Sequence, residues 1–166
     1  MTRILFVAAY VVISIRYGAW KRWKEYYSTF LYAIIGDLGY NLLFYEKSLW
    51  EYKNLVSHIF SDLLIAFIVF PCAITLFLTN YPVKRKRALY ILIWAGIHTA
   101  LEYISCRLGN FVHYNNWNIL WSMALYCIAF VLIRVHSVKP LLAWPISIVM
   151  AYSTMFFFHV PLGGMK

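Results

Sequence analysis

Long apolar segments, separated by short polar and basic connections, run through the whole chain. A transmembrane α-helix needs about 20 mostly apolar residues, with a usable range of about 17–25. The pattern therefore predicts an all-α fold, an integral membrane helical bundle with six transmembrane helices. We place these helices at about residues 4–20, 27–45, 55–80, 88–106, 117–137 and 140–160.

Two of these segments contain an interruption. Arg16 breaks the first apolar run, so the alternative is five spans plus an N-terminal helix that lies in the membrane interface. Pro71 lies inside the third segment and predicts a kink or tilt there. No repeat and no linker long enough to separate domains is present, so residues 1–166 are expected to form a single transmembrane domain.

The composition supports a membrane protein. Hydrophobic residues make up 63% of the chain, and the mean hydropathy is +0.68. Soluble domains contain about 45–50% apolar residues, and the excess here is too large for a small soluble core to hide. The net charge of +9 would suggest nucleic-acid binding in a soluble protein, but the basic residues are clustered between apolar segments. We therefore expect lipid partners and no nucleic acid.

The basic clusters predict the orientation. Ten lysines and arginines flank the first, third and fifth connections, and five lie on the other side. Because basic residues collect in cytoplasmic loops, the odd connections are expected to be cytoplasmic and both termini extracytoplasmic. The densest basic cluster needs no regulatory role, because its part in setting the orientation already explains it. We expect it to contact anionic lipid head groups. It consists of Lys84, Arg85, Lys86 and Arg87.

Three polar pairs lie inside consecutive apolar segments, each with a spacing of four residues, so each pair shares one helix face. Ionisable groups in lipid cost about 2.5–3.5 kcal/mol on insertion scales and usually face a protein interior or a wet cavity. With the predicted orientation, all three pairs fall in the outer half of the membrane. We expect them to form a ligand-binding pocket for a small ligand, an ion or a lipid head group. The residues are Asp37, Asn41, His58, Asp62, His98 and Glu102.

Two other interpretations stay open. The polar groups could bond one another and fix helix registry in a structural protein or an accessory subunit of a membrane complex. Alternatively, His58, Asp62, His98 and Glu102 could hold zinc in a membrane hydrolase, with Asp37 as the general base. No H-E-x-x-H pattern is present, so no cofactor is expected, and whether the protein is an enzyme stays open.

Two further features bear on the architecture. The outer segment from His113 to Asn118 could form a lid over the pocket, but a helix cap and an interfacial anchor are favoured. Gly96 and Ala100 form a small-x-x-x-small face on the fourth predicted helix, which would let another helix approach closely. We expect this face to serve packing inside the bundle, with a homo-oligomer or a membrane-protein partner as the alternative.

Several short strings carry a family resemblance. They are residues 23–27 (WKEYY), 35–41 (IGDLGYN), 101–105 (LEYIS), 116–118 (NWN) with Ser122, and 139–144 (KPLLAW). Together they resemble an uncharacterised family of small multi-pass membrane proteins of Bacillus and related Firmicutes. The resemblance implies an all-helical protein in a bacterial cytoplasmic membrane. It brings no activity, substrate or site residue.

Overall fold

The computed structural model describes residues 2–18, 20–53 and 63–160. Within these ranges the fold is dominated by helices, and the prediction of an all-α protein is confirmed. A π-helical turn, η2 (Ile65–Val69), leads directly into the helix that begins at Phe70. The chain also forms two short 3-10 turns, η1 (Trp20–Arg22) and η3 (Lys84–Lys86). The α-helices are α1 (Thr2–Tyr17), α2 (Trp23–Leu43), α4 (Phe70–Thr79), α5 (Arg87–Arg107), α6 (Ile119–Val138) and α7 (Pro140–Phe157).

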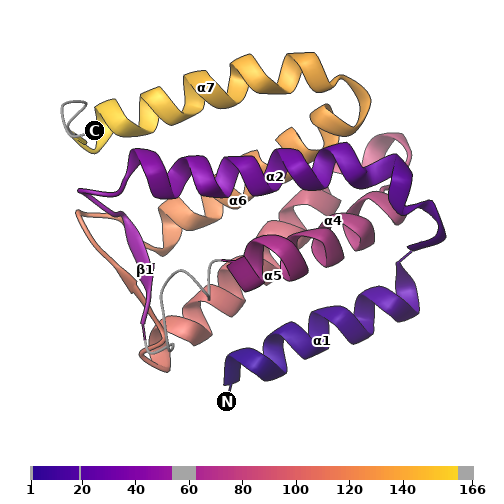
Figure 1. Cartoon of the computed structure of the whole chain (residues 1–166), viewed down its shortest axis with the longest axis horizontal. Coiled ribbons are helices and arrows are strands. Elements are labelled where there is room, and N and C mark those ends of the chain that lie inside the picture. The colour runs from indigo at the N-terminus through magenta and orange to yellow at the C-terminus, as the bar shows by residue number, and fades with distance from the viewer. Residues whose placement is uncertain (1, 19, 54–62, 161–166) are drawn as a thin grey trace.

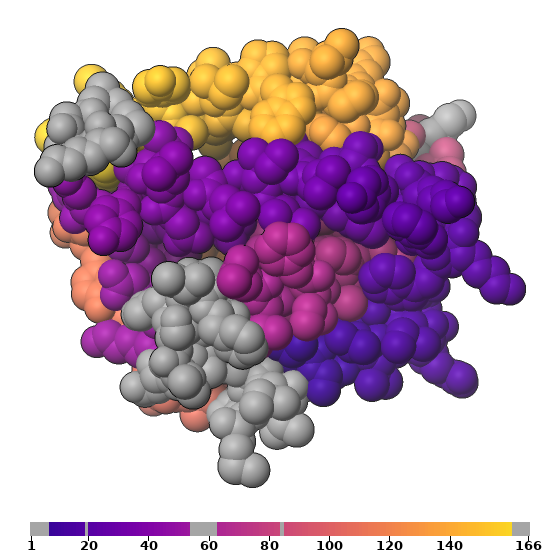
Figure 2. All heavy atoms as spheres, viewed as in Figure 1, coloured from indigo at the N-terminus to yellow at the C-terminus, as the bar shows by residue number. Residues whose placement is uncertain are grey.

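The helices run back and forth along one common direction (Figure 1). The helix α2 packs against α4 and α6, while α5 packs against α6, and α6 against α7. Figure 2 shows the side chains of α2 lying directly against those of η2 and α4. At the opposite edge, α1 packs on η2 and α4. The first helix therefore lies along the other helices and not across their ends.

A short β-ribbon, which the sequence pattern did not predict, closes one end of the bundle. Strand β1 (Trp50–Tyr52) pairs antiparallel with β2 (Phe111–His113), and Trp50 lies opposite His113. Figure 1 shows the ribbon beside the end of α2. We call this end of the molecule the ribbon end. The opposite end carries η1, η3 and the α6–α7 connection, and we call it the basic end.

Large apolar side chains cover the outside of the helices, while several small polar side chains are buried. Leu42 is 69% exposed and Val149 is 63% exposed, whereas Ser14, Thr29 and Thr75 are completely buried. Extensive apolar surface in water would drive aggregation, and small polar residues are typical of helix interfaces in lipid. This distribution indicates a protein whose surrounding medium is the hydrocarbon of a membrane.

Within residues 2–18, 20–53 and 63–160, three helices are long and apolar enough to cross a membrane: α5, α6 and α7, with mean hydropathies of 1.3, 1.9 and 1.4. Apolar stretches at Val7–Tyr17 and Ile65–Thr79 are shorter. The helix α2 has 21 residues but carries Lys24, Glu25 and Asp37. The six predicted spans are thus supported for three helices, and the chain has the features of a membrane protein.

A π turn precedes Pro71, for which the sequence predicted a kink or tilt. Proline has no N–H group, and its ring collides with the carbonyl four residues earlier, which here belongs to Phe67. The helix responds by widening: the Phe70 N–H bonds to the Ile65 carbonyl, which is a π-type hydrogen bond. The irregularity near Pro71 is therefore a π turn, and the predicted kink or tilt stays a prediction.

Gly18 allows α1 to pack closely on α4. Its N–H donates to the Ser14 carbonyl at 2.8 Å, just after the end of α1. A Cβ atom at position 18 would lie 2.5 Å from that carbonyl oxygen and 3.0 Å from Cγ2 of Thr75. Only glycine fits at this contact without a shift of α1.

Gly96 does not act as expected. A Cβ atom added there would meet no other heavy atom within 4 Å, and Ala100 is exposed. Within the described part of the chain, this small-residue face is therefore open, and the expectation that it serves packing inside the bundle is wrong. The close approach of helices occurs instead at Gly18.

Candidate functional site

Glu102 is the most deeply buried charged side chain at the ribbon end, with 7% of its surface exposed. Its Oε1 atom lies 2.8 Å from Nε2 of His113, and its Oε2 atom accepts a hydrogen bond from the Tyr126 hydroxyl at 2.6 Å. An ionised carboxylate only accepts hydrogen bonds, so Nε2 of His113 carries the hydrogen. Two donors, from β2 and α6, therefore stabilise a carboxylate on α5.

His98 lies one helical turn before Glu102 on the same face of α5. Its Nδ1 atom lies 2.9 Å from the Trp94 carbonyl oxygen, and its Nε2 atom lies 3.0 Å from the Tyr10 hydroxyl. Because a carbonyl only accepts, Nδ1 carries the hydrogen, and Nε2 of the neutral ring accepts from Tyr10. The His98 ring also contacts the Tyr126 ring, with a centroid distance of 5.5 Å.

We call these side chains the Glu102 network, and α1, α5, α6 and β2 contribute to it. Its members are Tyr10, His98, Glu102, His113 and Tyr126. Access is graded: the His113 side chain is 17% exposed, while that of Glu102 is 5% exposed. The network is thus reached from the ribbon end through His113, and Glu102 lies beneath it.

The six predicted site residues are divided among different places. His98 and Glu102 belong to one network, as their spacing indicated. Asp37 and Asn41 lie on α2, which packs against η2, α4, α6 and α7, and the Asn41 side chain bonds the Asp37 carbonyl at 3.2 Å. His58 and Asp62 lie outside the described residues. Of the three predicted pairs, the structure therefore joins only His98 and Glu102 to other members of a polar network among the described residues.

Three members of the network were absent from the predicted site. Tyr10 and Tyr126 lie in apolar segments, where a tyrosine is usually read as an interfacial or core residue. His113 lies in the connection after α5, and only the strand pairing of Trp50 with His113 brings it back over Glu102. The sequence placed His113 in the connection after the fourth predicted helix, near the same end as Glu102, but gave no register for it.

The segment after β2 contains the helix cap favoured from the sequence, while its Trp117 is buried and packs on the ribbon. Asn118 is the N-cap of α6, and its Oδ1 atom accepts from the N–H groups of Leu120 and Trp121 at 2.9 and 3.3 Å. The Trp117 ring packs on Trp50, with a centroid distance of 4.9 Å, and the Trp50 ring stacks on Tyr40 at 4.0 Å. These contacts fix the ribbon to α2 and α6.

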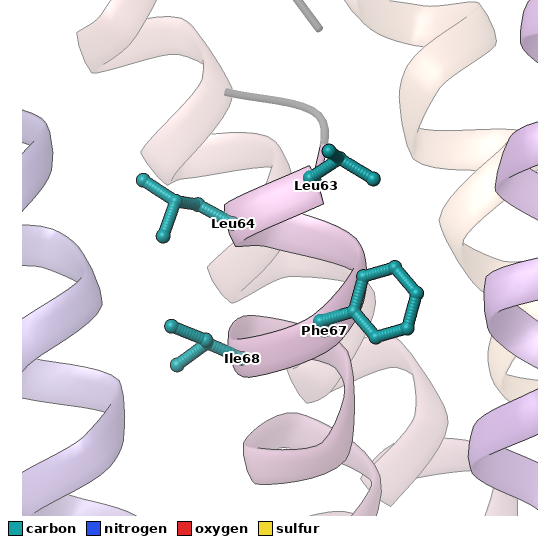
Figure 3. A pocket seen from close by; sticks show the side chains of 4 residues that line it. All are labelled: Leu63, Leu64, Phe67 and Ile68. Atoms are coloured by element: carbon teal, nitrogen blue, oxygen red, sulfur yellow. The ribbon is translucent and has the colours of Figure 1, made fainter. Parts of the chain in front are cut away.

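Two cavities are apolar and lie away from the network. One is an open depression of about 380 Å³, lined by Leu63, Leu64, Phe67 and Ile68 (Figure 3). The other, of about 230 Å³, lies between α6 and α7 and is lined mainly by aromatic and aliphatic side chains, among them Trp121 and Phe157. Neither cavity is lined by a candidate site residue, so neither is the polar pocket expected from the sequence.

Metal binding gains no geometric support. Among the described residues, no group of three or more His, Cys, Asp or Glu side chains gathers closely enough to hold a metal ion. The Nε2 lone pair of His98 is used by Tyr10. Two of the four candidate ligands, His58 and Asp62, lie outside the described residues.

A second buried polar cluster lies toward the basic end. His136 is 4% exposed, its Nδ1 atom lies 3.1 Å from Oγ1 of Thr29, and its ring stacks on Tyr32 at 4.2 Å. The Tyr32 hydroxyl bonds Ser147. This cluster ties α2 to α6 and α7 and is enclosed by those helices, so it reads as packing.

Comparisons with protein-family models, with curated proteins and with solved structures gave no match to this chain.

Proposed function

We propose that this protein is a multi-pass membrane protein that binds protons from the outer side of a bacterial cytoplasmic membrane at Glu102. The observation that carries the proposal is the buried Glu102 carboxylate, bonded to the partly exposed His113 at 2.8 Å. Of the six residues expected to form an outward-facing polar site, the proposal assigns proton binding to Glu102, with His113 and Tyr126 as its hydrogen-bond partners.

The ligand class follows from the space available. A small organic ligand needs a cavity with converging polar groups, but the two cavities described above are apolar and lie elsewhere. A proton needs no cavity. Glu102 and His113 are both proton acceptors, and the exposed edge of His113 offers a route from water to the carboxylate. We therefore favour proton binding over binding of a larger molecule.

Proton binding has a mechanical consequence. With Glu102 ionised, its carboxylate accepts charge-assisted hydrogen bonds from His113 and Tyr126. A proton neutralises the carboxylate, and a charge-assisted hydrogen bond is lost. His113 belongs to β2, so acid weakens the attachment of the ribbon to α5. Other titratable groups at this site are Tyr10, His98, Cys106 and Tyr126.

Orientation is part of the proposal. The basic end carries the connections before α2, before α5 and before α7, and ten basic residues flank them. If these face the cytoplasm, the ribbon end and both termini face outward. We also propose that α1, α2 and the η2–α4 helix cross the membrane, because they run parallel to the three long apolar helices (Figure 1).

Infrared titration in vesicles of defined orientation tests the proposal. Acidifying the outside of right-side-out vesicles should produce a carboxylic C=O band that is lost in Glu102→Gln and kept in Asp37→Asn. In inside-out vesicles, the same external acid should produce no such band. A band that survives in Glu102→Gln, or one that appears equally from both sides, would refute proton binding at this site.

A structural role is the second candidate. Both carboxylate oxygens of Glu102 and both ring nitrogens of His98 already have hydrogen-bond partners. A fully satisfied network can serve only to hold helices in register, for example in an accessory subunit. In that case Glu102→Gln would change the stability of the protein, but the wild type would show no acid-induced carboxylic C=O band.

A further inference from the structure

Tyr81, between α4 and α5, holds two arginines at the basic end. The guanidinium carbon of Arg134, from the last part of α6, lies 4.7 Å from the centroid of the Tyr81 ring. That of Arg87, the first residue of α5, lies 6.0 Å from the same centroid. Both distances are within the range of cation–π contacts. One aromatic ring thus gathers two positive charges that are 47 positions apart in the sequence (134 minus 87).

The position of the ring is fixed by the core. Tyr81 packs edge-on against Phe77, which is fully buried, with a centroid distance of 5.3 Å, and against Tyr90 at 5.7 Å. Arg134 is half-buried, and its Nη1 atom also lies 3.4 Å from Oγ of Ser137. The Arg134 guanidinium is therefore held in place before any ligand arrives, which lowers the entropy cost of binding.

No carboxylate in the described part of the chain forms an ion pair with Arg87 or Arg134. Among the described residues, the ion pairs are Arg22 with Glu25 and His113 with Glu102. None of the six acidic residues of the chain lies in the α4–α5 or α6–α7 connection. Two positive charges that lie 4.7 and 6.0 Å from one ring centroid repel each other, so the arrangement favours an anion nearby.

We propose that Arg87 and Arg134, gathered on Tyr81, form a binding site for the phosphate of an anionic lipid head group in the inner leaflet. Planar guanidinium groups match the geometry of phosphate oxygens. The site lies at the start of α5 and in the last part of α6, two helices long and apolar enough to cross a membrane, and further basic residues of the same loop, such as Arg85, add to its potential. It is separate from the Glu102 network at the other end.

Native mass spectrometry of the purified full chain tests this site, with phosphatidylglycerol and phosphatidylcholine as probes. The wild type should retain phosphatidylglycerol in preference to phosphatidylcholine. Arg134→Gln and Arg87→Gln should each reduce that retention about fivefold or more. Arg107→Gln, at the other end of α5, and Lys139→Gln, at the same end but outside the site, should leave it nearly unchanged.

Two further variants separate a defined site from a diffuse positive field. Tyr81→Phe keeps the aromatic ring, so this variant should retain the lipid. Tyr81→Leu leaves both arginines in place but removes the ring that gathers them, so this variant should lose the lipid. Equal losses in Lys139→Gln and Arg134→Gln would overturn the site in favour of a diffuse field. Because Arg87 is exposed, Arg87→Gln should fold even if Arg134→Gln does not. Saturable binding of inorganic phosphate that displaces the lipid at equal concentration would assign the site to the free anion and overturn the lipid proposal.

Discussion

The side chains of Glu102 and His113 meet at 2.8 Å, although one lies in the long helix α5 and the other in the short strand β2. This contact ties the ribbon to the bundle above a carboxylate that is almost fully buried. It explains why an acid is tolerated in a helix apolar enough to cross a membrane: the carboxylate has donors from two neighbouring elements.

Tyr126→Phe should destabilise the protein, because it removes one of the two donors to Glu102 and leaves a buried oxygen without its partner. The expected loss is about 1–3 kcal/mol in the free energy of unfolding. Denaturant unfolding in detergent micelles measures this loss. Tyr103→Phe is the matched control, since Tyr103 is 54% exposed and should change stability very little. Equal effects of the two variants would contradict the assignment of Tyr126.

Glu102→Gln and His113→Gln should be energetically coupled. If the pair is a charge-assisted hydrogen bond, the double variant should lose less stability than the sum of the single variants, with a coupling of about 0.5–3 kcal/mol. The same unfolding assay gives the three values needed. Additive effects would mean that the 2.8 Å contact between Nε2 of His113 and Oε1 of Glu102 contributes no stability to the protein in micelles.

Gly18→Ala should weaken the packing of α1 on α4, because the new Cβ atom would lie 3.0 Å from Cγ2 of Thr75 on α4 and 2.5 Å from the Ser14 carbonyl oxygen at the end of α1 itself. Backbone cannot move out of the way cheaply, so a loss of about 1–3 kcal/mol is expected. Gly36→Ala is the matched control in α2, where nothing lies within 4 Å. That variant should be neutral or stabilise its helix by up to about 1 kcal/mol. Thermal unfolding of both variants gives the comparison, and a tolerated Gly18→Ala would show that α1 is not docked here.

Asn118→Ala should destabilise the start of α6, because the side chain caps two backbone N–H groups. Loss of such a cap costs about 0.5–2 kcal/mol. Asn41→Ala serves as the control, since the exposed Asn41 side chain bonds only a carbonyl of its own helix. Hydrogen exchange of the Leu120 and Trp121 amides reports the local effect. Unchanged protection of these amides would be inconsistent with the cap.

The helices were predictable because membrane spans carry a strong local signal. The predicted ranges 88–106 and 140–160 compare with Arg87–Arg107 and Pro140–Phe157 in the structure. The ribbon was not predictable, because β1 and β2 have three residues each and are 59 positions apart (111 minus 52) at their nearest ends. Such short strands are specified by their tertiary contacts and not by their own sequence.

The candidate site was predictable only where it is local. His98 and Glu102 share a helix face, so their four-residue spacing was enough to pair them. The partners Tyr10, His113 and Tyr126 come from other elements, and helix rotation decides which of them face α5. The Asp37–Asn41 pair has the same spacing, but its helix packs on different neighbours. Spacing identifies a shared face and does not say what that face meets.

Hydrogen exchange of the β-ribbon as a function of pH tests the central claim most directly. Exchange at Trp50–Tyr52 and Phe111–His113, corrected for the intrinsic pH dependence, would be compared near neutral pH and at about pH 3, where ordinary carboxyl groups are protonated, in lipid nanodiscs. The account predicts that the wild-type ribbon loses protection in acid and that Glu102→Gln has the same, lower protection at both pH values. A wild-type ribbon equally protected at both, or a Glu102→Gln ribbon that responds to acid as the wild type does, would contradict it.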